Sequence, residues 1–558
     1  MTTRAELRGE GDAVEQHHGE RDGGGTGIAA RRGRAHPWRL WALCALLVVL
    51  SGWFRPYAEL SAPNERSRLY LAVAMVDHHS LSVDESIRRF GPILDIATHQ
   101  GHRYSDKAPG LSFLMAPAYA ALRWIAPAAG WNAAQLLGIL RPLIMVPLTF
   151  LGVLLTAALC RRRGLGISQT NLALLAWMLG SGALHYATVL YGHHVLAVVM
   201  VAALLCSPMG TSVTSPGGLR QGVLGRDASR ALSFGALLGL MPLIEYQGAL
   251  AAIAFGVAGL ARRQPSWRHT VMTLGTASIG PLLLGLYHWQ AFGGVFELPY
   301  HHLLDPRLRA VHGIGLAGVT WPTLRGLWGP WWSLHRGLWT TSPWLCLGLL
   351  GAHRAWRRGH RAFTVAVVGA WLGYGGFVSS SNMWEAGWSF GPRLLVPMLG
   401  VTVSFVAEGL DGVSARRGLR VLAASSIVYA AALYGLAQAT FPEPTPDLLH
   451  PLRDLFLPLF ANGLWSPSWA MSWGIVPELL TGLLWSAAAL TLVALLVGRW
   501  LAESRAWGAV VRELLLSLGF GLGALGLMAA VPSATPSSVQ QGNLAWVESL
   551  SRRARGNP

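Results

Sequence analysis

The chain has 558 residues, of which 52% are hydrophobic and only 13% are charged, and its mean hydropathy is +0.39. Soluble domains carry about 25% charged residues, so this composition excludes a water-soluble enzyme, a disordered chain and a collagen-like chain. The net charge of +17 comes from arginines grouped in short clusters between apolar runs. That pattern is typical of loops that set membrane topology, and not of a surface that binds nucleic acid.

The N-terminal part divides into two segments. Residues 1–36 are polar, rich in Gly and Arg and without apolar periodicity, so they are predicted to form a disordered cytoplasmic tail. The apolar run 38–54 follows, and because no small-residue cleavage motif comes after it, we interpret it as a retained signal-anchor helix. Residues 37–530 are expected to form one transmembrane domain, followed by a C-terminal tail over 531–558.

Apolar runs of about 17–25 residues recur along the chain and predict membrane-spanning helices. The stretch 232–261 is apolar but interrupted by Glu245-Tyr246-Gln247, with basic residues on both flanks, so it predicts two short helices joined by a polar turn. The other runs lie at 142–160, 168–187, 193–207, 270–290, 338–352, 363–380, 394–409, 420–440, 476–498 and 509–530.

The distribution of arginine predicts the orientation of these helices. Loops rich in arginine alternate with loops nearly free of it, and the positive-inside rule places the arginine-rich loops in the cytoplasm. We therefore expect a multi-pass protein of the bacterial inner (plasma) membrane with a cytoplasmic N-terminus. The arginine-rich loops are 161–163, 220–230, 262–268, 354–361, 416–420 and 499–512.

The number of spans depends on the first periplasmic loop, residues 55–140. The stretch 108–126 is apolar, is interrupted by prolines and follows a charged segment, so we expect a juxtamembrane helix that does not cross. Leu69, Val73 and Val76 share one stripe of a helix over 64–78, which predicts an amphipathic helix on the outer leaflet. The expected fold class is an all-α polytopic membrane protein with about 13 transmembrane helices, juxtamembrane helices in its long first loop and an extracytoplasmic C-terminus.

The first candidate site is Asp106-Lys107, at the predicted boundary between water and lipid. Lys107 is the only lysine in the chain. An ammonium group is a compact point charge for phosphate, and a carboxylate beside it could act as a general base. A solvated loop with a local ion pair explains the same residues.

The second candidate is Glu65, at the start of the predicted amphipathic helix. Asn64 and Glu65 fit a helix N-terminus, where a capping side chain and an acid are favourable. Alternatively, Glu65 faces a cavity as the general base that deprotonates an acceptor hydroxyl. Asp77, Asp84 and Asp106 are further acids of the same loop that could take this role.

The third candidate segment, residues 384–393, lies between two predicted helices on the outer side. Arg393 is the only basic residue of its loop and begins a helix at the interface, where a lone arginine is costly unless it pairs with phosphate or carboxylate. Trp384 and Trp388, on either side of Glu385, could anchor the chain at the membrane interface or form a platform for a sugar ring.

Shorter signals lie on the same predicted side. His193 and His194 are neighbours on a helix, where their side chains point in different directions, which disfavours a shared metal. Glu245 and Tyr246 place polar groups between two apolar helices, and an ionisable group within a membrane is a functional candidate. Arg336 adds a cation at an outer boundary. We expect these residues to converge on one face.

Together these segments resemble the C-type glycosyltransferases, polytopic membrane proteins that use polyprenyl-phosphate sugars and include protein O-mannosyltransferases and lipid A aminoarabinose transferases. The resemblance covers most of residues 38–530. It rests on Asn64-Glu65, Asp106-Lys107-Ala108-Pro109, Tyr287–Gly293, His335–Leu338 and Gly387–Arg393. In the superfamily the first acid of the loop is typically an Asp that serves as catalytic base. Here Asn64 takes that position, whereas Lys107 matches the position used near the lipid phosphate.

The resemblance implies a membrane glycosyltransferase that moves a sugar from a polyprenyl-phosphate carrier to a periplasmic acceptor. Glu65, Asp106 or Asp77 would deprotonate the acceptor. The lipid phosphate would be bound by Lys107, Arg393 and Arg336, and the substrates would be contacted by Glu245, Tyr246, His194, Trp384, Glu385 and Trp388. A divalent cation could assist, but the sequence shows no ligand set for a metal.

Two other classes of protein fit the composition. A transporter or lipid flippase would place polar residues along a route through the membrane, where Glu245 is the candidate. A catalytically degenerate member of the superfamily, acting as a membrane scaffold for a partner, would account for Asn64. The residues do not distinguish which sugar or acceptor a transferase would use.

Overall fold

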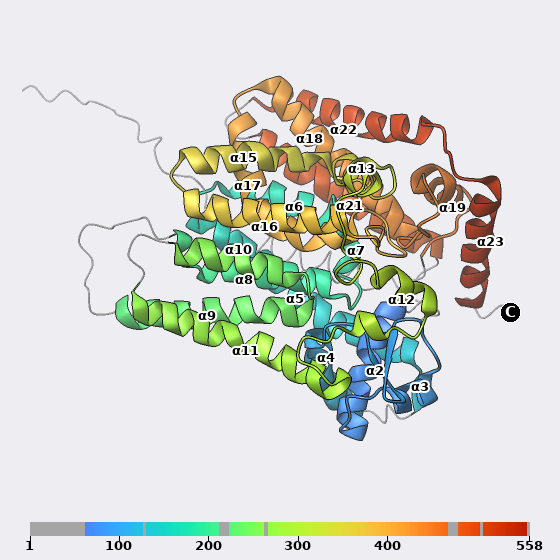
Figure 1. The fold of residues 1–558 in the computed structure, drawn as a ribbon. Coiled ribbons are helices and arrows are strands. Elements are labelled where there is room, and N and C mark those ends of the chain that lie inside the picture. The colour runs from blue at the N-terminus through green and yellow to red at the C-terminus, as the bar shows by residue number, and fades with distance from the viewer. Residues whose placement is uncertain are drawn as a thin grey trace, which may run out of the picture. The chain divides into compact units, whose positions relative to one another are not determined.

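The computed structural model describes residues 62–125, 130–210, 223–261, 266–466, 478–502 and 506–554. The predicted tail 1–36 and the predicted signal-anchor run 38–54 lie outside the described residues. Helices make up most of the described chain (Figure 1), and seven of them are long and apolar enough to cross a membrane. The protein is therefore a polytopic, mostly α-helical membrane protein, as the sequence predicts.

Residues 62–125 form a group of short elements. These are α2 (Pro63–His78), α3 (Asp84–Phe90), β1 (Ile96–His99), β2 (His102–Ser105) and α4 (Gly110–Ile125). β1 and β2 are antiparallel, with Ile96 opposite Ser105. Gln100 and Gly101 both have positive φ, 50° and 83°, as a two-residue type I′ hairpin turn requires. This hairpin was not predicted, because strands of four residues show too little alternation.

Helix α2 differs from the amphipathic helix predicted for the outer leaflet. It begins at Pro63, which fits the first turn of a helix because proline has no N–H to leave unpaired. Its buried residues include charged and polar side chains on every face: Asn64, Glu65, Ser67, Arg68, Leu69, Tyr70, Leu71, Ala72, Val73 and Ala74. The prediction of a surface helix is therefore wrong. The polar residues of α2 are satisfied by partners on other elements, so the helix packs inside the protein.

The predicted apolar runs within the described residues all form helices. The long candidates for membrane spans fall in α5 (Ala133–Arg162), α9 (Val223–Ile244), α11 (Trp267–Phe292), α16 (Arg361–Ser380), α17 (Val396–Val413), α18 (Arg417–Ala439) and α22 (Trp507–Ala530). Shorter apolar helices are α6 (Ile167–Leu179), α8 (Gly192–Cys206), α10 (Gly248–Leu260) and the part of α21 (Glu478–Leu501) from Ser486. A turn at Glu245–Gln247 separates α9 from α10, as predicted.

Short helices connect the spans. They are α7 (Ala183–Tyr186), α12 (Pro306–His312), α13 (Leu324–Trp332), α14 (Leu338–Thr341), α15 (Cys346–Arg357), α19 (Leu457–Ala461) and α23 (Ser537–Ala554). Single helical turns lie at η2 (Pro208–Gly210), η4 (Pro299–His302), η5 (Pro343–Leu345), η6 (Arg393–Leu395) and η7 (Leu452–Phe456).

Glycines allow the closest helix pairs to form. A Cβ added to Gly280 of α11 would lie 1.8 Å from the carbonyl oxygen of Gly239 in α9, and one added to Gly351 of α15 would lie 1.7 Å from the carbonyl oxygen of Phe405 in α17. Backbones that approach through small residues are characteristic of helix packing in membranes, where lipid removes the hydrophobic drive between helices.

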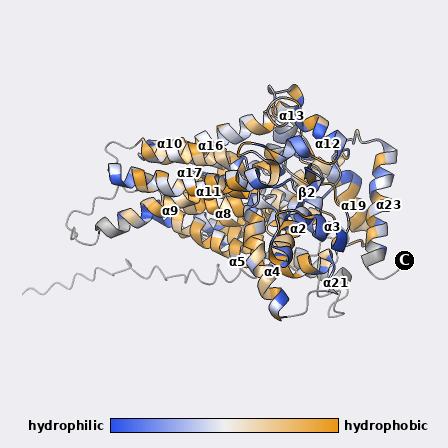
Figure 2. Ribbon diagram, turned by 60° about the horizontal axis from the view of Figure 1, so that its bottom comes forward, coloured by the Kyte–Doolittle hydropathy of each residue, from blue (hydrophilic) through white to orange (hydrophobic). Residues whose placement is uncertain are grey.

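The two ends of the helices carry different arrangements of charge. At one end, arginines of the predicted cytoplasmic clusters pair with acids, as in Arg358–Asp411 at 3.0 Å and Arg420–Glu513 at 2.7 Å. The other end, called the site end below, is built from residues 62–125 and the loops 180–191, 245–247, 293–345, 381–395 and 440–456. Figure 2 shows apolar residues along the long helices and hydrophilic residues around α3 and α12.

Helix α23 also lies at the site end. The ring of Trp546 meets that of Trp388 edge to face, with 4.8 Å between centroids, and meets Phe441 at 5.5 Å. Asn543 of the same helix accepts a hydrogen bond from the hydroxyl of Thr445 at 3.1 Å. The C-terminal helix is thus fastened to the loops 381–395 and 440–456.

Candidate functional site

A buried ion pair joins α2 to α5. Arg141 donates from Nε to Oε1 of Glu65 at 2.9 Å and makes a second bond to Oε2. The backbone N–H of Leu190 also donates to Oε1, at 2.6 Å. Glu65 is only 1% exposed, so this carboxylate is held by three donors and positions the start of α2 against α5 and the loop 180–191.

A second buried pair joins α2 to the turn between α9 and α10. Arg68 donates to Oε1 of Glu245 at 2.6 Å and also bonds the side chain of Asn64. Gly192 lies so close that a Cβ there would be 2.2 Å from Oε1 of Glu245. Because Gly192 has no side chain, the Glu245 carboxylate can lie against the N-terminus of α8.

Lys107 lies between two carboxylates. Its Nζ is 2.7 Å from Oδ2 of Asp106 and 3.0 Å from Oδ2 of Asp95. The hydroxyl of Ser67 on α2 donates to Asp106 at 3.3 Å. Burial opposes the charge on Lys107, but the two carboxylates outweigh it and raise the pKa of Lys107 above its usual value. Lys107 is thus a permanent cation, and its charge is already matched by the two acids.

Arg393, by contrast, rests on neutral groups. Its Nε donates to Nε2 of His193 at 3.1 Å, and Nη1 donates to the carbonyl of Ala386 at 2.8 Å. The guanidinium also lies over the ring of Tyr191, 4.8 Å from the centroid. Because Nε2 of His193 accepts, the proton of a neutral imidazole is on Nδ1, and that atom is buried without a hydrogen-bond partner in the described part of the chain.

Arg336 is a second cation of the same kind. It donates to the hydroxyl of Ser389 and to the carbonyl of Gly387 at 2.7 Å, and it is 2% exposed. Burial and, to a smaller extent, the charge of Arg393 lower the pKa of Arg336 to about 10. Among the described residues, no carboxylate oxygen lies within 4.0 Å of either guanidinium. Arg336 and Arg393, called the arginine pair below, therefore carry positive charge that the described acids leave unpaired.

The arginine pair and Lys107 share neighbours. Asp95, which binds Lys107, lies within electrostatic range of Arg393, and so does Glu245. Both members of the arginine pair also lie within electrostatic range of Tyr186. Burial raises the pKa of Tyr186 although these two positive charges lower it. The structure thus brings the first loop and the loops 333–337 and 381–395 together at the site end.

Other predicted site residues differ in how they are placed. Tyr246 shares a hydrogen bond of 3.1 Å with His288, and Glu385 is half-buried within electrostatic range of Arg336. Trp384 fills the space next to Gly329, and Trp388 meets α23. Trp384, Glu385 and Trp388 thus lie in the loop that carries Arg393, whereas Tyr246 lies in the turn between α9 and α10.

Two predicted residues lie apart from this cluster. Asp77, at the C-terminal end of α2, accepts from Tyr119 at 2.8 Å and pairs with Arg123 at 2.9 Å. His194 is buried between helices, 3.0 Å from the hydroxyl of Thr149 and stacked on Trp177. Within the described ranges, no group of three or more His, Cys, Asp or Glu side chains is arranged to hold a metal ion.

One carboxylate of the site end was not singled out from the sequence. Oε1 of Glu443 lies 3.2 Å from Nε2 of His185 and accepts from the hydroxyl of Tyr191 at 3.3 Å. Glu443 is 4% exposed. The signal that could have identified it is its position between Pro442 and Pro444. Two prolines exclude a helix at this point, so Glu443 cannot be explained as an acid on the solvated face of a helix.

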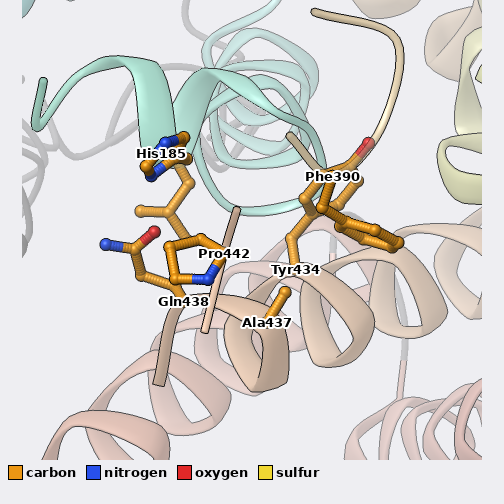
Figure 3. Close-up of a pocket in the computed structure, with 7 residues that line it drawn as sticks. His185, Phe390, Tyr434, Ala437, Gln438 and Pro442 are labelled. Carbon is orange, nitrogen blue, oxygen red and sulfur yellow. The ribbon is translucent and has the colours of Figure 1, made fainter. Parts of the chain in front are cut away.

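A small cavity lies on the far side of His185 (Figure 3). It is lined by Leu184, His185, Phe390, Tyr434, Ala437, Gln438 and Pro442, and about 10 Å³ of it is open to the centre of a water molecule. That is room for about one water. Nδ1 of His185 and Oε1 of Gln438 are both buried without a partner among the described residues, so a bound water would satisfy them.

No family model matches the chain, and no curated protein matches it. Among solved structures, ArnT from Cupriavidus metallidurans bound to undecaprenyl phosphate aligns at 16% identity and a TM-score of 0.46, over 89% of this chain and 78% of ArnT. The oligosaccharyltransferase of Archaeoglobus fulgidus aligns at 13% identity and a TM-score of 0.45, over 74% of this chain. The chain spans only 57% of that enzyme's length. Both alignments are therefore at low sequence identity.

Proposed function

We propose that this protein is a membrane glycosyltransferase that takes a sugar from a polyprenyl-phosphate carrier and transfers it to an acceptor outside the cytoplasm. The observation that carries the proposal is the arginine pair, which lies at the site end without a carboxylate partner among the described residues. Arg336 is buried and Arg393 is partly buried, and a cation withdrawn from water without a counter-ion is costly. A phosphate group of a lipid would supply the missing charge.

The geometry of the arginine pair suits a phosphate. Guanidinium groups bind phosphate oxygens through paired N–H donors. The buried Nδ1–H of His193, next to Arg393, is a further donor that the described chain leaves free. Ala386 and Gly387, which accept from the two arginines, have positive φ of 58° and 71°, so the loop that presents these carbonyls is itself held in an uncommon conformation.

The same cations would assist the reaction. As the bond between the anomeric carbon and the phosphate oxygen breaks, its electron pair stays with the phosphate, and negative charge grows there. Fixed cations in a site of low dielectric constant stabilise that charge without reorganising, and holding donor and acceptor together removes most of the entropic barrier. In this proposal Arg336, Arg393 and Lys107 bind the phosphate, and Tyr246 and Glu385 contact the sugar.

The acids of the first loop take different parts in the proposal. Glu65 would have to release Arg141 and the N–H of Leu190 before it could accept a proton, so we assign it to positioning. Asp106 holds Lys107 and could accept a proton only by weakening that pair. Asp77 lies at the other end of α2 and is assigned to holding α2 against Tyr119.

The membrane arrangement is part of the proposal. The positive-inside rule places the arginine-rich end in the cytoplasm and the site end outside the bacterial inner membrane. With the run 38–54 and the short helices counted, about 13 helices would cross. The donor would then be a lipid of the same chemical class as the undecaprenyl phosphate held by the aligned ArnT structure.

A transfer assay with reconstituted protein tests the function. Proteoliposomes are given a panel of radiolabelled undecaprenyl-phosphate sugars, with water and membrane extract as acceptors, and the release of undecaprenyl phosphate is followed. We expect release with one of the donors and loss of release in Arg336→Gln and Arg393→Gln. Arg358→Gln, at the opposite end, serves as the matched control and should keep full activity. Movement of the labelled lipid across the bilayer without any covalent product would contradict transfer and favour a flippase.

A further inference from the structure

The carboxylate of Glu443 differs in its partners from Glu65, Asp106 and Glu245, three other buried acids of the site end. Glu65, Asp106 and Glu245 are each bound to an arginine or a lysine. Among the described residues, Glu443 is bound by His185 and the hydroxyl of Tyr191, and it lies within electrostatic range of Arg141. Glu443 can therefore take up a proton without breaking a hydrogen bond to an arginine or a lysine.

Glu443 also lies close to the arginine pair. Tyr191 connects the two, since its ring lies under the guanidinium of Arg393 and its hydroxyl donates to Oε1 of Glu443. Tyr186 lies within electrostatic range of Glu443, Arg393 and Arg336 alike. Glu443 thus lies one tyrosine side chain away from Arg393, near the place where a phosphate would bind the arginine pair.

The two oxygens of Glu443 are not equivalent. Oε1 makes both of these contacts, while Oε2 makes no hydrogen bond to any described residue. The carboxylate is therefore held in place through one oxygen and offers the other to an incoming hydroxyl.

We propose that Glu443 is the general base of the transferase, and that His185 is a positioning residue that holds it and shares its proton. This inference rests on the proposed function. The acceptor O–H gives its proton to Oε2 of Glu443 as the acceptor oxygen bonds to the anomeric carbon. The bond from that carbon to the phosphate oxygen breaks, and its electron pair leaves with the phosphate on the arginine pair. The products are the glycosylated acceptor, the polyprenyl phosphate and protonated Glu443.

The cavity beside His185 supports this role. His185 lies between Glu443 at Nε2 and the space for one water at Nδ1, and Gln438 faces the same space with an unpaired oxygen (Figure 3). A proton on Glu443 could thus be shared with the imidazole, whose other nitrogen would bond the water. A histidine that serves only to fill space would not need a polar cavity behind it.

Glu443→Gln tests the inference, because glutamine keeps the shape and still accepts from Tyr191 but cannot take the proton. Two quantities are measured on each variant: the rate of transfer in proteoliposomes, and the binding of undecaprenyl phosphate. We expect Glu443→Gln to lower kcat by about 10²–10⁴-fold while the Kd for undecaprenyl phosphate stays within threefold of wild type. Glu443→Asp should recover part of the rate. Asp447→Asn, an exposed acid of the same loop, is the control and should transfer at the wild-type rate.

The results separate the two proposals. If the wild type transfers and Glu443→Gln does so within threefold of it, the base is elsewhere and the inference is overturned, although the transferase stands. If the wild type binds undecaprenyl phosphate but transfers no sugar, the proposed function fails and the base fails with it. Should Glu443→Gln not fold, the decision passes to Glu443→Asp, where an unchanged kcat would also overturn the inference. His185→Phe should lower kcat and leave KM within threefold; a change in KM alone would show that His185 has no part in holding the base.

Discussion

Arg393, which is partly buried, donates a hydrogen bond from Nε to Nε2 of His193 at 3.1 Å and so contacts an imidazole ring instead of a carboxylate. His193 comes from the start of α8 and Arg393 from the start of η6 and α17. Two helices that are distant in the chain thus meet at the site end through a contact that leaves the positive charge available to a ligand.

This contact gives a direct prediction for His193→Asp. The new carboxylate would pair with Arg393 and cancel the charge that the lipid phosphate is proposed to meet. We expect the affinity for undecaprenyl phosphate to fall by about tenfold to a hundredfold, the equivalent of one charge-assisted hydrogen bond of roughly 1.5–3 kcal/mol. His193→Gln keeps an acceptor for Nε without adding charge and should bind within threefold of wild type. Equal binding by both variants would mean that Arg393 does not contact the phosphate.

Breaking the Glu65–Arg141 pair should cost stability. Glu65→Ala leaves the guanidinium of Arg141 buried without its partner and also frees the N–H of Leu190. Removing one member of a buried pair costs about 3–5 kcal/mol, so we expect a clear fall in the melting temperature of the detergent-solubilised protein. Glu85→Ala, which removes an exposed acid paired with Arg88, should leave it unchanged. A melting temperature equal to wild type in Glu65→Ala would show that this pair does not hold α2.

Gly192→Ala should disturb the second buried pair. The added Cβ would lie 2.2 Å from Oε1 of Glu245 and force that carboxylate away from Arg68. We expect lower thermal stability. Gly523→Ala, on α22 with no atom within 4 Å of the new Cβ, should be neutral or stabilising by up to about 1 kcal/mol, because alanine favours the helix. A similar melting temperature for the two variants would contradict the close approach at Gly192.

Features that depend on neighbouring residues in the chain could be predicted from the sequence, whereas contacts between distant residues could not. The spans and the turn at Glu245 follow from apolar runs and their interruptions, which are local properties. The convergence of Lys107 with Arg393 was predicted only as loops on one side of a membrane. That Arg393 would meet His193, or that Glu65 would meet Arg141, depends on contacts between residues 200 and 76 positions apart. One sequence carries no local signal for such pairs.

The errors have the same physical origin. Helix α2 looked amphipathic because Leu69, Val73 and Val76 share a stripe, but its polar residues are buried as well and find partners on β2, on α5 and in the turn between α9 and α10. Glu443 was overlooked because a loop acid is ordinarily solvated, and only the fold shows that Tyr191 and His185 enclose it.

The hairpin region offers a prediction on pH. Partial burial opposes the charge on Asp84, but hydrogen bonds from Arg103, Ser82 and His102 outweigh it and lower the pKa of Asp84 to about 2. A carboxyl whose pKa is lowered on folding stabilises the fold above its unfolded pKa, about 3.9, and this contribution is lost as the pH falls toward 2. We expect the β1–β2 amides to lose protection against hydrogen exchange as the pH falls from 4 to 2. The loss in the free energy of protection should be up to about 2 kcal/mol. Asp84→Asn should show weak protection throughout that range; a pH-dependent loss equal to wild type would contradict the assignment to Asp84.

The binding of undecaprenyl phosphate to the purified protein, compared between wild type and the double variant Arg336→Gln/Arg393→Gln, tests the central claim most directly. With both guanidiniums gone, we predict a Kd at least a hundredfold higher, whereas Arg358→Gln binds like wild type. A double variant that binds undecaprenyl phosphate as tightly as wild type, with its fold intact by melting temperature, would contradict the claim that the arginine pair holds the phosphate.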